Sequence, residues 1–398
     1  MSYFGKKTVE DINLCNKRVL LRCDFNVPFD DVGKISNTKR IDVSLDTIRY
    51  LKKNNAKIII VSHLGRPKGV SRQEFSLEPV ADYLSKVLGA KVKFIKRDVR
   101  DDAQESLTTL EAGEVALLEN IRFYKEEEQD DLEFSKKLAS LADVYVNDAF
   151  GTTHRAHSST HGVARFLPAA CGFLIKKELD ILSEILNKPK RPFVAVLGGS
   201  KVSDKIGVIE NLLSKVDIMI AAGGMAYTFL NALGYSIGSS VFEVDKVSLA
   251  KDIMAKAKEL NVRFILPVDT VVGETFAPKT KSMVVSADSI PEGWAGLDIG
   301  PKTMQLFSEV ICSASTILWN GPVGVFEWKN FREGTLSVAK AIAQSDAVSV
   351  VGGGDSTAAV EMLGFADKLT HISTGGGAML ELLAGKELPG IAALDDKK

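Results

Sequence analysis

The sequence predicts an α/β fold of two doubly wound, Rossmann-like parallel-sheet domains joined by a hinge helix. Short apolar strands alternate with helical segments along the whole chain, as in consecutive βαβ units. A long amphipathic segment, 173–187, runs into the proline-punctuated stretch 188–192, after which a new strand begins. A chain of 398 residues also favours two or three domains. We therefore expect domains at 1–172 and 191–379, with the helix and linker at 173–190.

In the first half, the expected strands end at polar side chains. The strands are 18–23, 57–62, 92–95, 115–118 and 144–146. The residues that follow them include Asp24, Phe25, Asn26, His63, Leu64, Gly65, Arg66, Asn120, Arg122, Asn147 and Asp148. Open parallel sheets bind ligands at the carboxyl ends of their strands, so we expect a site there. Helices are expected near 44–54 and 78–88, and the acidic run 126–133 is expected to be a solvated helix start.

Five cationic side chains of this half follow the strands or lie in their loops. They are Arg40, His63, Arg66, Arg122 and Arg155. A single arginine is more often a surface residue than a ligand, but five at one sheet edge indicate a binding site. Arginine binds carboxylate and phosphate through two parallel hydrogen bonds. The pattern therefore predicts a small, strongly anionic substrate.

A metal site is the alternative for one of these loops. Three of the five histidines, His154, His157 and His161, lie after the strand 144–146. Metal ligation requires neutral imidazoles, and Arg155 among them opposes a bound cation. Since no cysteine lies nearby, an anion site is favoured over a metal site.

In the second half, most strands end in glycine turns. The strands are 193–197, 218–222, 262–266, 316–319, 347–351 and 371–373. The turns include 198–199, 223–224, 352–354 and 375–377. Lys201 and Lys205 follow the first of these turns and place two ammonium groups near one phosphate chain. The spacing G-x-x-x-x-G-K-[ST] of a Walker A loop does not occur in the sequence.

The stretch 347–360 combines a buried strand, the turn 352–356 and a helical start. Backbone N–H groups and the helix dipole make such a turn suited to a phosphate. Asp355 in this turn would either cap the helix or hold a metal ion. For this stretch alone, a strand-to-helix turn without a ligand is an equal alternative. The recurrence of the same architecture elsewhere in the chain favours phosphate binding.

Composition excludes several classes of function. The 50 Lys and Arg nearly balance the 51 Asp and Glu, which argues against nucleic-acid or membrane-surface partners. No apolar run approaches the length of a bilayer span, and the polar start lacks the apolar core of a signal peptide. The four cysteines form no C-x-x-C pair, and we expect buried thiols in a reducing cytoplasm. They are Cys15, Cys23, Cys171 and Cys312.

These residues, in this order, closely resemble the phosphoglycerate kinase family across essentially the whole chain. The most specific motifs are His63-Leu64-Gly65-Arg66-Pro67, His154-Arg155-Ala156-His157, Trp319-Asn320-Gly321-Pro322 and Gly352-Gly353-Gly354-Asp355-Ser356. The resemblance implies glycolytic, Mg²⁺-dependent phosphoryl transfer between 1,3-bisphosphoglycerate and ADP, giving 3-phosphoglycerate and ATP. It also implies closure of two lobes, a last segment, 380–398, that returns to the first domain, and a cytoplasmic monomer.

The resemblance further implies roles for single residues. The 3-phosphoglycerate site would include Asp24, Phe25, Asn26, Arg40, His63, Leu64, Gly65, Arg66, Arg122 and Arg155. The nucleotide site would include Lys201, Lys205, Gly223, Gly224, Gly296, Asn320, Glu327, Gly353, Gly354, Asp355 and Ser356. Asp355 would bind Mg²⁺ and Glu327 the ribose. Arg40 and Lys201 would be the catalytic residues, because they bring positive charge to the transferring phosphoryl group from both sides.

Two other classes of function fit the sequence less well. A nicotinamide dehydrogenase requires G-x-G-x-x-G after a strand, with an acidic residue about 20 positions further on, and no such unit is present. A non-catalytic, two-lobed anion-binding protein has no need of a lysine pair facing a glycine–aspartate turn. Phosphoryl transfer to an ionised carboxylate also needs no general base, and the motifs contain no base with an orienting partner.

Overall fold

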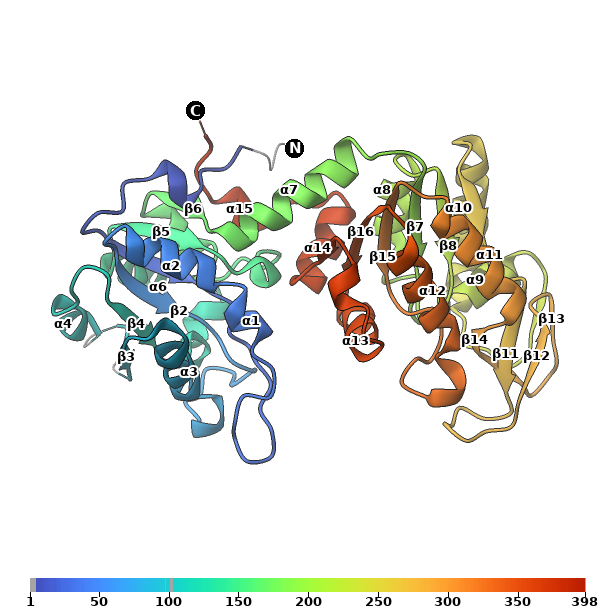
Figure 1. Cartoon of the computed structure of the whole chain (residues 1–398), viewed down its shortest axis with the longest axis horizontal. Helices are drawn as coiled ribbons and strands as arrows, with labels where there is room; N and C mark the ends of the chain where they lie inside the picture. Colours follow the sequence, from blue (N-terminus) through green and yellow to red (C-terminus); the bar gives the residue numbers. More distant parts are fainter. Residues whose placement is uncertain (1–4, 97, 101–102, 398) are drawn as a thin grey trace. The chain divides into compact units, whose positions relative to one another are not determined.

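In the computed structural model, which describes residues 5–96, 98–100 and 103–397, the strands form two separate six-stranded parallel sheets. The chain divides into two compact units (Figure 1). Unit 1 comprises Met1–Ile181 and Glu387–Lys398, and unit 2 comprises Leu182–Lys386. Residues 1–4 and 398, the extreme ends of the predicted first domain and last segment, lie outside the described residues.

The sheet of unit 1 confirms the strands expected in the first half. Its order is β3-β4-β2-β1-β5-β6, and all its pairings are parallel. The strands are β1 (Arg18–Arg22), β2 (Lys57–Val61), β3 (Val92–Ile95), β4 (Val115–Leu118), β5 (Val144–Asn147) and β6 (Ala169–Cys171). The short β6 was not expected from the sequence. The central strands are continuously apolar because helices cover both faces of the sheet.

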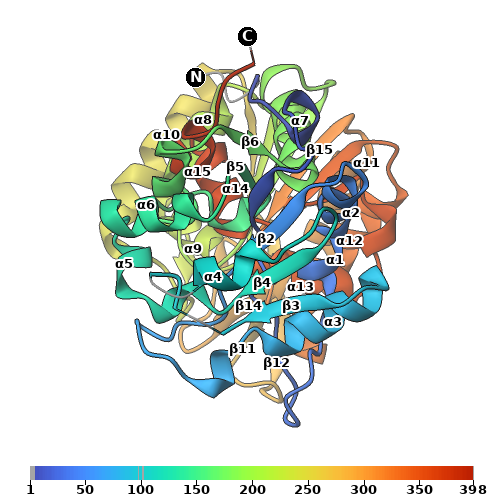
Figure 2. The same ribbon diagram turned by 90° about the vertical axis from the view of Figure 1, so that its left-hand side faces the viewer.

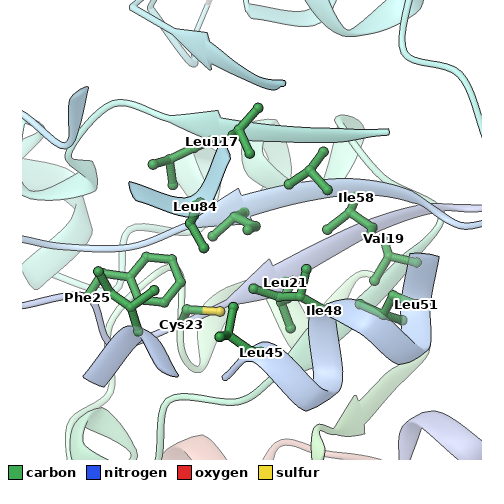
Figure 3. Close-up of a cluster of buried hydrophobic side chains, with 14 of the residues drawn as sticks. Val19, Leu21, Cys23, Phe25, Leu45, Ile48, Leu51, Ile58, Leu84 and Leu117 are labelled. Carbon is green, nitrogen blue, oxygen red and sulfur yellow. The ribbon is translucent and has the colours of Figure 1, made fainter. Parts of the chain in front are cut away.

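The helices of unit 1 are α1 (Lys39–Asp42), α2 (Leu45–Lys53), α3 (Glu78–Leu88), α4 (Ala103–Thr108), α5 (Lys125–Glu128), α6 (Leu132–Ser140) and α15 (Pro389–Ala392). Among them, α2, α3 and α6 are amphipathic and bury one apolar face each. Leu45, Ile48 and Leu51 of α2 recur at helical spacing and pack on Val19 and Leu21 of β1 (Figure 3). Figure 2 shows α5 and α6 on the side of this sheet away from α2 and α3.

Of the last segment predicted from the sequence, 380–398, residues 387–398 belong to unit 1, whereas 380–386 belong to unit 2. Gly390 exchanges backbone hydrogen bonds with the first domain: its N–H donates to the Thr153 carbonyl at 2.9 Å, and its carbonyl accepts from Asn147 Nδ2 at 3.2 Å. The helix α7 (Phe173–Asn187) has the bounds predicted for the connecting helix and carries the chain from unit 1 into unit 2.

The main sheet of unit 2 has the order β10-β8-β7-β15-β16-β17, again entirely parallel. Its strands are β7 (Phe193–Leu197), β8 (Ile218–Ala221), β10 (Arg263–Ile265), β15 (Thr316–Asn320), β16 (Val348–Gly352) and β17 (His371–Ile372). The helices are α8 (Ile206–Leu213), α9 (Met225–Ala232), α10 (Val247–Glu259), α11 (Pro301–Cys312), α12 (Glu333–Gln344), α13 (Gly354–Met362) and α14 (Gly376–Leu383). The predicted fold class, two doubly wound parallel sheets, is therefore confirmed.

Unit 2 also contains two small sheets that the sequence reasoning missed. One is antiparallel with the order β12-β11-β14, and the other pairs β9 with β13. Their strands are β9 (Ser236–Ile237), β11 (Asp269–Gly273), β12 (Ser282–Ser286), β13 (Ser289–Ile290) and β14 (Ala295–Ile299). These strands lack the continuous apolar pattern of a covered parallel strand, because β12 is largely exposed.

Two expectations about burial were wrong in part. Cys23 and Cys171 are buried, but Cys15 and Cys312 are exposed. In the acidic run after β4, Glu127 is completely buried rather than solvated. No helix in the part of the chain that the structure describes is long and apolar enough to cross a membrane.

Candidate active site

The ends of β1 and β2 bring cations and a carboxylate together in unit 1. Arg40 Nη1 lies 2.6 Å from Asp24 Oδ2. Asp24, in the loop after β1, therefore holds the side chain of Arg40, which is on α1, in place. His63 Nδ1, after β2, lies 3.8 Å from the other oxygen of Asp24 and 3.3 Å from Nη2 of Arg22. The ends of β1 and β2 and the helix α1 therefore meet at one edge of the sheet.

Two amide side chains, the partly exposed Asn26 and the fully buried Asn120, fix the loop after β2. The Gly65 N–H donates to Asn26 Oδ1 at 2.8 Å. Asn120, after β4, accepts from the Leu64 N–H at 3.2 Å and donates to the Leu64 carbonyl at 2.7 Å. Arg122 Nη1 donates to the Gly65 carbonyl at 2.9 Å. The backbone of this loop is thus clamped between the ends of β1 and β4.

The positive charges of this edge act on one another. Burial lowers the pKa of His63 well below its usual range, and Arg22, Arg122 and Arg40 act in the same direction. Burial also lowers the pKa of His157 to about 4, with Arg122, Arg22 and Arg155 contributing. Both imidazoles are therefore neutral at pH 7, while the guanidiniums remain charged. The group of Arg22, Arg40, Arg122, Arg155, His63 and His157 is called the cationic cluster below.

Some predicted residues stand apart from the polar contacts. The side chains of Phe25 and Leu64 are buried in the core, so they present only their backbone at the strand ends. Arg66 is exposed, and no hydrogen bond or ion pair among the described residues joins it to the cationic cluster. Arg155 is exposed and donates from Nε to His154 Nε2 at 3.1 Å. Within the described residues, no group of three or more His, Cys, Asp or Glu is placed to hold a metal ion.

Sequence reasoning missed three residues of this edge. Arg22, 1% exposed, lies inside the apolar strand β1 and contacts His63. Ser159 accepts from Arg22 Nε at 2.9 Å, and Glu127 in turn accepts from the Ser159 hydroxyl at 2.6 Å. The interruption of an apolar strand by Arg22 was the one available signal, because a buried arginine requires partners.

In unit 2 the strand ends approach one another through their backbones. The Gly198 N–H donates to the Asn320 carbonyl at 2.9 Å, and the Gly199 N–H donates to the Pro322 carbonyl at 3.0 Å. A Cβ added at Gly223 would lie 2.8 Å from the Gly199 carbonyl oxygen. Side chains are excluded here, so the turns after β7, β8 and β15 form one compact glycine-lined edge.

Asn320 connects this edge to Lys205 and to the turn after β16. Its Oδ1 accepts a hydrogen bond from Lys205 Nζ, and its Nδ2 donates to the Gly352 carbonyl at 2.7 Å. Ser356 Oγ accepts from the Gly321 N–H at 2.6 Å, which ties the start of α13 to the turn after β15. Gly353 has a φ of 98°, a left-handed conformation that glycine adopts without strain.

The charges of this edge come from side chains at helix starts. Burial lowers the pKa of Lys205 to about 8, while Asp204 and Asp355 oppose the shift. Asp355 lies exposed in the first turn of α13, but the N-cap residue is Gly353 and no side-chain cap hydrogen bond forms. Lys201 is exposed in the loop between β7 and α8. The carboxylate of Asp355 and the ammonium of Lys201 are thus exposed to a phosphate and its counter-ion, whereas the buried Lys205 is held by Asn320.

The two remaining predicted residues lie beside the smaller antiparallel sheet. Gly296 is on β14, where a Cβ would overlap the Tyr227 hydroxyl of α9, the helix that begins after the glycine turn 223–224. Glu327 is exposed in the loop after β15. That loop runs along β14, because the Val325 N–H donates to the Leu297 carbonyl at 2.9 Å. Both residues therefore lie near this sheet rather than at the Lys205–Asn320 contact.

An arginine-rich sheet edge in one unit and a glycine–lysine edge in the other define the class of a two-domain kinase for a small anionic substrate. The family described as phosphoglycerate kinase matches residues 9–386. The chain therefore belongs to the phosphoglycerate kinase family, glycolytic transferases whose phosphoryl acceptor is a carboxyl group.

Full-length relatives agree with this assignment. A phosphoglycerate kinase of Clostridium novyi is 57% identical over 396 residues, which is 99% of each chain. One of Clostridium botulinum is 56% identical over 99% of this chain and all of its own. Among solved structures, phosphoglycerate kinase from Coxiella burnetii has a TM-score of 0.90 at 44% identity, and that from Pyrococcus horikoshii has 0.83 at 36%. Each comparison of structures covers 98% of both chains.

Proposed function

We propose that this chain transfers a phosphoryl group reversibly between 1,3-bisphosphoglycerate and ADP, giving 3-phosphoglycerate and ATP. The observation that carries the proposal is the cationic cluster of unit 1, which gathers four guanidiniums and two neutral imidazoles at one sheet edge. Such a density of charge is suited to a small molecule with both carboxylate and phosphate groups. Family membership supports the same substrate class.

In this proposal, unit 1 binds the phosphoglycerate. The guanidiniums of Arg122 and Arg155 face the anionic groups, and neutral His63 offers a ring N–H. Asn26 and Gly65 hold the loop after β2 in place through their 2.8 Å hydrogen bond. Arg66, exposed after β2, would reach the substrate from the loop itself.

Unit 2 binds the nucleotide in this proposal. The backbone N–H groups of the glycine turns and the start of α13 face the phosphates, and Lys205 supplies a positive charge. Asp355 fits a Mg²⁺ ligand, because Mg²⁺ is usually held by one or two carboxylates together with the substrate phosphates. Bound Mg²⁺ would neutralise phosphate charge there. Gly296, whose Cβ position is filled by the Tyr227 hydroxyl, would face the nucleotide through its backbone, and Glu327 would contact the ribose.

The chemistry assigned to the chain is positioning and charge stabilisation. The accepting carboxylate is ionised at neutral pH, so no general base is required. Arg40 of unit 1 and Lys201 of unit 2 would face the equatorial oxygens of the phosphoryl group in an in-line transfer. Reacting atoms must approach within about 3–3.5 Å, which requires that the two edges come together in the reaction.

We further propose that the two units close about the segments that join them. These are α7 and, after the predicted pivot near 374–377, the crossing between Lys386 and Glu387. One chain supplies both edges, so the proposal requires no second copy. The radius of gyration in solution should fall with both substrates present, and fall less with either alone. Scattering curves that superimpose in all states would contradict closure.

A coupled assay for ATP formation from 1,3-bisphosphoglycerate and ADP tests the activity directly. The expected result is Mg²⁺-dependent turnover within the usual range of kinases, about 1–100 s⁻¹ or faster. A protein that binds 3-phosphoglycerate and ADP in calorimetry without turnover would instead be a non-catalytic binding protein. Loss of both binding and turnover in well-folded protein would overturn the proposal.

A further inference from the structure

Glu127 is a completely buried carboxylate beneath the cationic cluster, and the proposed chemistry does not use it. It belongs to the one-turn helix α5, whose neighbouring residue Glu128 is exposed. Both of its carboxylate oxygens accept hydrogen bonds from Ser159, at 2.8 Å from the backbone N–H and 2.6 Å from the hydroxyl. Burial raises the pKa of Glu127, but Arg22 and the bonds from Ser159 oppose this shift.

The hydroxyl of Ser159 connects Glu127 to Arg22 through two hydrogen bonds. Its proton is donated to Glu127, so its oxygen is left as an acceptor for Arg22 Nε at 2.9 Å. Arg22 Nη1 donates to the Cys23 carbonyl, and Nη2 lies 3.3 Å from His63 Nδ1. All three nitrogens of this buried guanidinium are therefore engaged, and its orientation is fixed.

The contact with Arg22 favours one position of the His63 proton, because Arg22 Nη2 at 3.3 Å is the nearer partner of Nδ1 and Asp24 Oδ1 at 3.8 Å lies beyond hydrogen-bond distance. A guanidinium can only donate, so the Nδ1 that faces it must accept. Burial and the surrounding arginines keep this imidazole neutral. A neutral ring with an acceptor at Nδ1 carries its proton on Nε2. The ring can then only donate from Nε2, which is the property an anionic ligand requires.

We propose that Glu127 and Ser159 are positioning residues, which hold Arg22 so that it fixes His63 in the tautomer with the proton on Nε2. The inference rests on the proposed function for its consequence, the binding of 3-phosphoglycerate by His63. The tautomer itself belongs to the unliganded protein and does not depend on that function.

The sequence provides a matched pair of serines for the test. Ser158 and Ser159 are adjacent and completely buried. Among the described residues, the hydroxyl of Ser158 bonds only to backbone carbonyls, those of Glu126 at 3.0 Å and Asp131 at 3.3 Å. Ser158→Ala therefore removes a buried hydroxyl of the same loop without touching Arg22, whereas Ser159→Ala breaks the connection between Glu127 and Arg22.

The first measurement is the ¹⁵N NMR spectrum of the histidine rings in unliganded protein, with His63 assigned through His63→Gln. Wild type and Ser158→Ala should show His63 protonated on Nε2 alone. Ser159→Ala should show a mixture of the two tautomers or the opposite one. A His63 spectrum that is unchanged in Ser159→Ala would overturn the proposal. If Ser159→Ala does not fold, Ser159→Cys, whose thiol is only a weak acceptor for Arg22 Nε, gives the same test.

The second measurement is steady-state kinetics in the direction that consumes 3-phosphoglycerate. Loss of a hydrogen bond to a charged ligand predicts that Ser159→Ala raises the KM for 3-phosphoglycerate by about tenfold, with the KM for ATP within about twofold of wild type. Equal changes in Ser158→Ala and Ser159→Ala would show a merely structural role and contradict the inference. If wild type shows no turnover with these substrates, the proposed function fails, while the NMR result still decides the tautomer.

Discussion

The two units share a fold, but the carboxyl edges of their sheets differ in the groups they present: charged side chains in unit 1 and backbone in unit 2. Each has six parallel strands, with ligand-facing loops at the carboxyl ends. Unit 1 places long charged side chains there, and buried amides such as Asn120 hold the loops that carry them. Unit 2 places backbone there, in turns so close that Gly198 and Gly223 have no space for a Cβ. One architecture thus presents charged side chains at one sheet edge and closely packed backbone at the other.

The difference follows from what each edge is proposed to bind. A small molecule with dense charge is held by groups that reach it from several sides, and guanidiniums do so with directional bonds. A chain of phosphates is held by a row of N–H groups, which requires close approach of the backbone. Substitutions should therefore affect the two edges for different reasons. In unit 1 they remove a charge that contacts the ligand, and in unit 2 an added Cβ overlaps the closely packed backbone.

The largest expected effect is on turnover, and it concerns one residue from each unit. Arg40→Ala and Lys201→Ala should each lower kcat by at least about 10²-fold, with both KM values changing less than about tenfold. The reason is that these two charges are proposed to contact the equatorial oxygens of the transferring group only in the transition state. Arg40→Lys should recover part of the loss, because one ammonium cannot reproduce the planar fork.

Steady-state kinetics at saturating substrates check this expectation. Arg49→Ala is a suitable control, because Arg49 is an exposed arginine of α2 that contacts only Asp46, at 4.0 Å, among the ion pairs of the described residues. Its kcat should stay within about twofold of wild type. An Arg40→Ala or Lys201→Ala enzyme that keeps more than about a tenth of wild-type kcat would rule out the transition-state role.

The next effect tests whether the edge of unit 2 depends on backbone packing. A Cβ at Gly198 would overlap the carbonyl oxygen of Pro322, so Gly198→Ala should lower the free energy of unfolding by about 2–3 kcal/mol. Gly354 is helical and has nothing within 4 Å of an added Cβ. Gly354→Ala should therefore be as stable as wild type or slightly more stable. Equal denaturation midpoints for the two variants would contradict this view of the edge.

Arg66→Ala is the matching substitution in unit 1. Because the Arg66 side chain is exposed, its loss should change the free energy of unfolding by less than about 0.5 kcal/mol. Its effect should instead be a weaker affinity for 3-phosphoglycerate, measured by calorimetry. A large loss of stability in Arg66→Ala would remove the contrast between the two edges.

A third effect, a pH dependence of the free energy of unfolding, should be common to both units. Burial raises the pKa of Asp148 in unit 1 to about 7, and does the same for Asp298 in unit 2. Asp148 accepts from the Leu174 N–H at 2.9 Å at the start of α7, and Asp298 accepts from the Gly334 N–H at 2.8 Å in α12. Each carboxyl thus occupies a buried helix start.

The sign of the pH dependence follows from these raised pKa values. A carboxyl with a raised folded pKa gives stability that is fully present below its unfolded pKa of about 4 and is lost as the pH rises through about 7. Asp148→Asn does not titrate at this position. Its free energy of unfolding should therefore improve relative to wild type by on the order of 2 kcal/mol between pH 5 and pH 8. Denaturant titrations at both pH values decide this, and a difference independent of pH would contradict it.

The smallest expected effect separates the nucleotide edge from the substrate edge. Asp355→Ala should weaken binding of the Mg²⁺-nucleotide by about tenfold and leave 3-phosphoglycerate affinity unchanged, because the carboxylate is proposed as a ligand of the ion. Asp367→Ala removes an equally exposed carboxylate just beyond α13 and serves as the control. Calorimetric titrations in which Asp355→Ala stays within about twofold of wild type would contradict the metal role.

Local pattern in the sequence was sufficient for the parallel strands of the two main sheets apart from the short β6, because strands covered on both faces are continuously apolar. The expected bounds of β3, β4, β7 and α7 agree with the structure. The antiparallel β11, β12 and β14 were missed: β12 is largely exposed, and β11 and β14, though mostly buried, contain acidic residues and glycines rather than a continuous apolar run. The residue types that follow each strand were also readable, whereas their roles in binding and catalysis stay predictions.

What the sequence determined by itself was therefore the fold class, the family and the chemical character of the two edges: cations in the first half, glycines and lysines in the second. Only the tertiary structure decided which of these groups meet. Arg66 stands apart, whereas Arg22, an irregularity in an apolar strand, reaches His63. Glu127, one acid in an acidic run, becomes the buried anchor of Arg22 through Ser159. Periodicity reports which face of an element is covered, but hydrogen-bond partners that are distant in sequence are set by how the strands and loops pack.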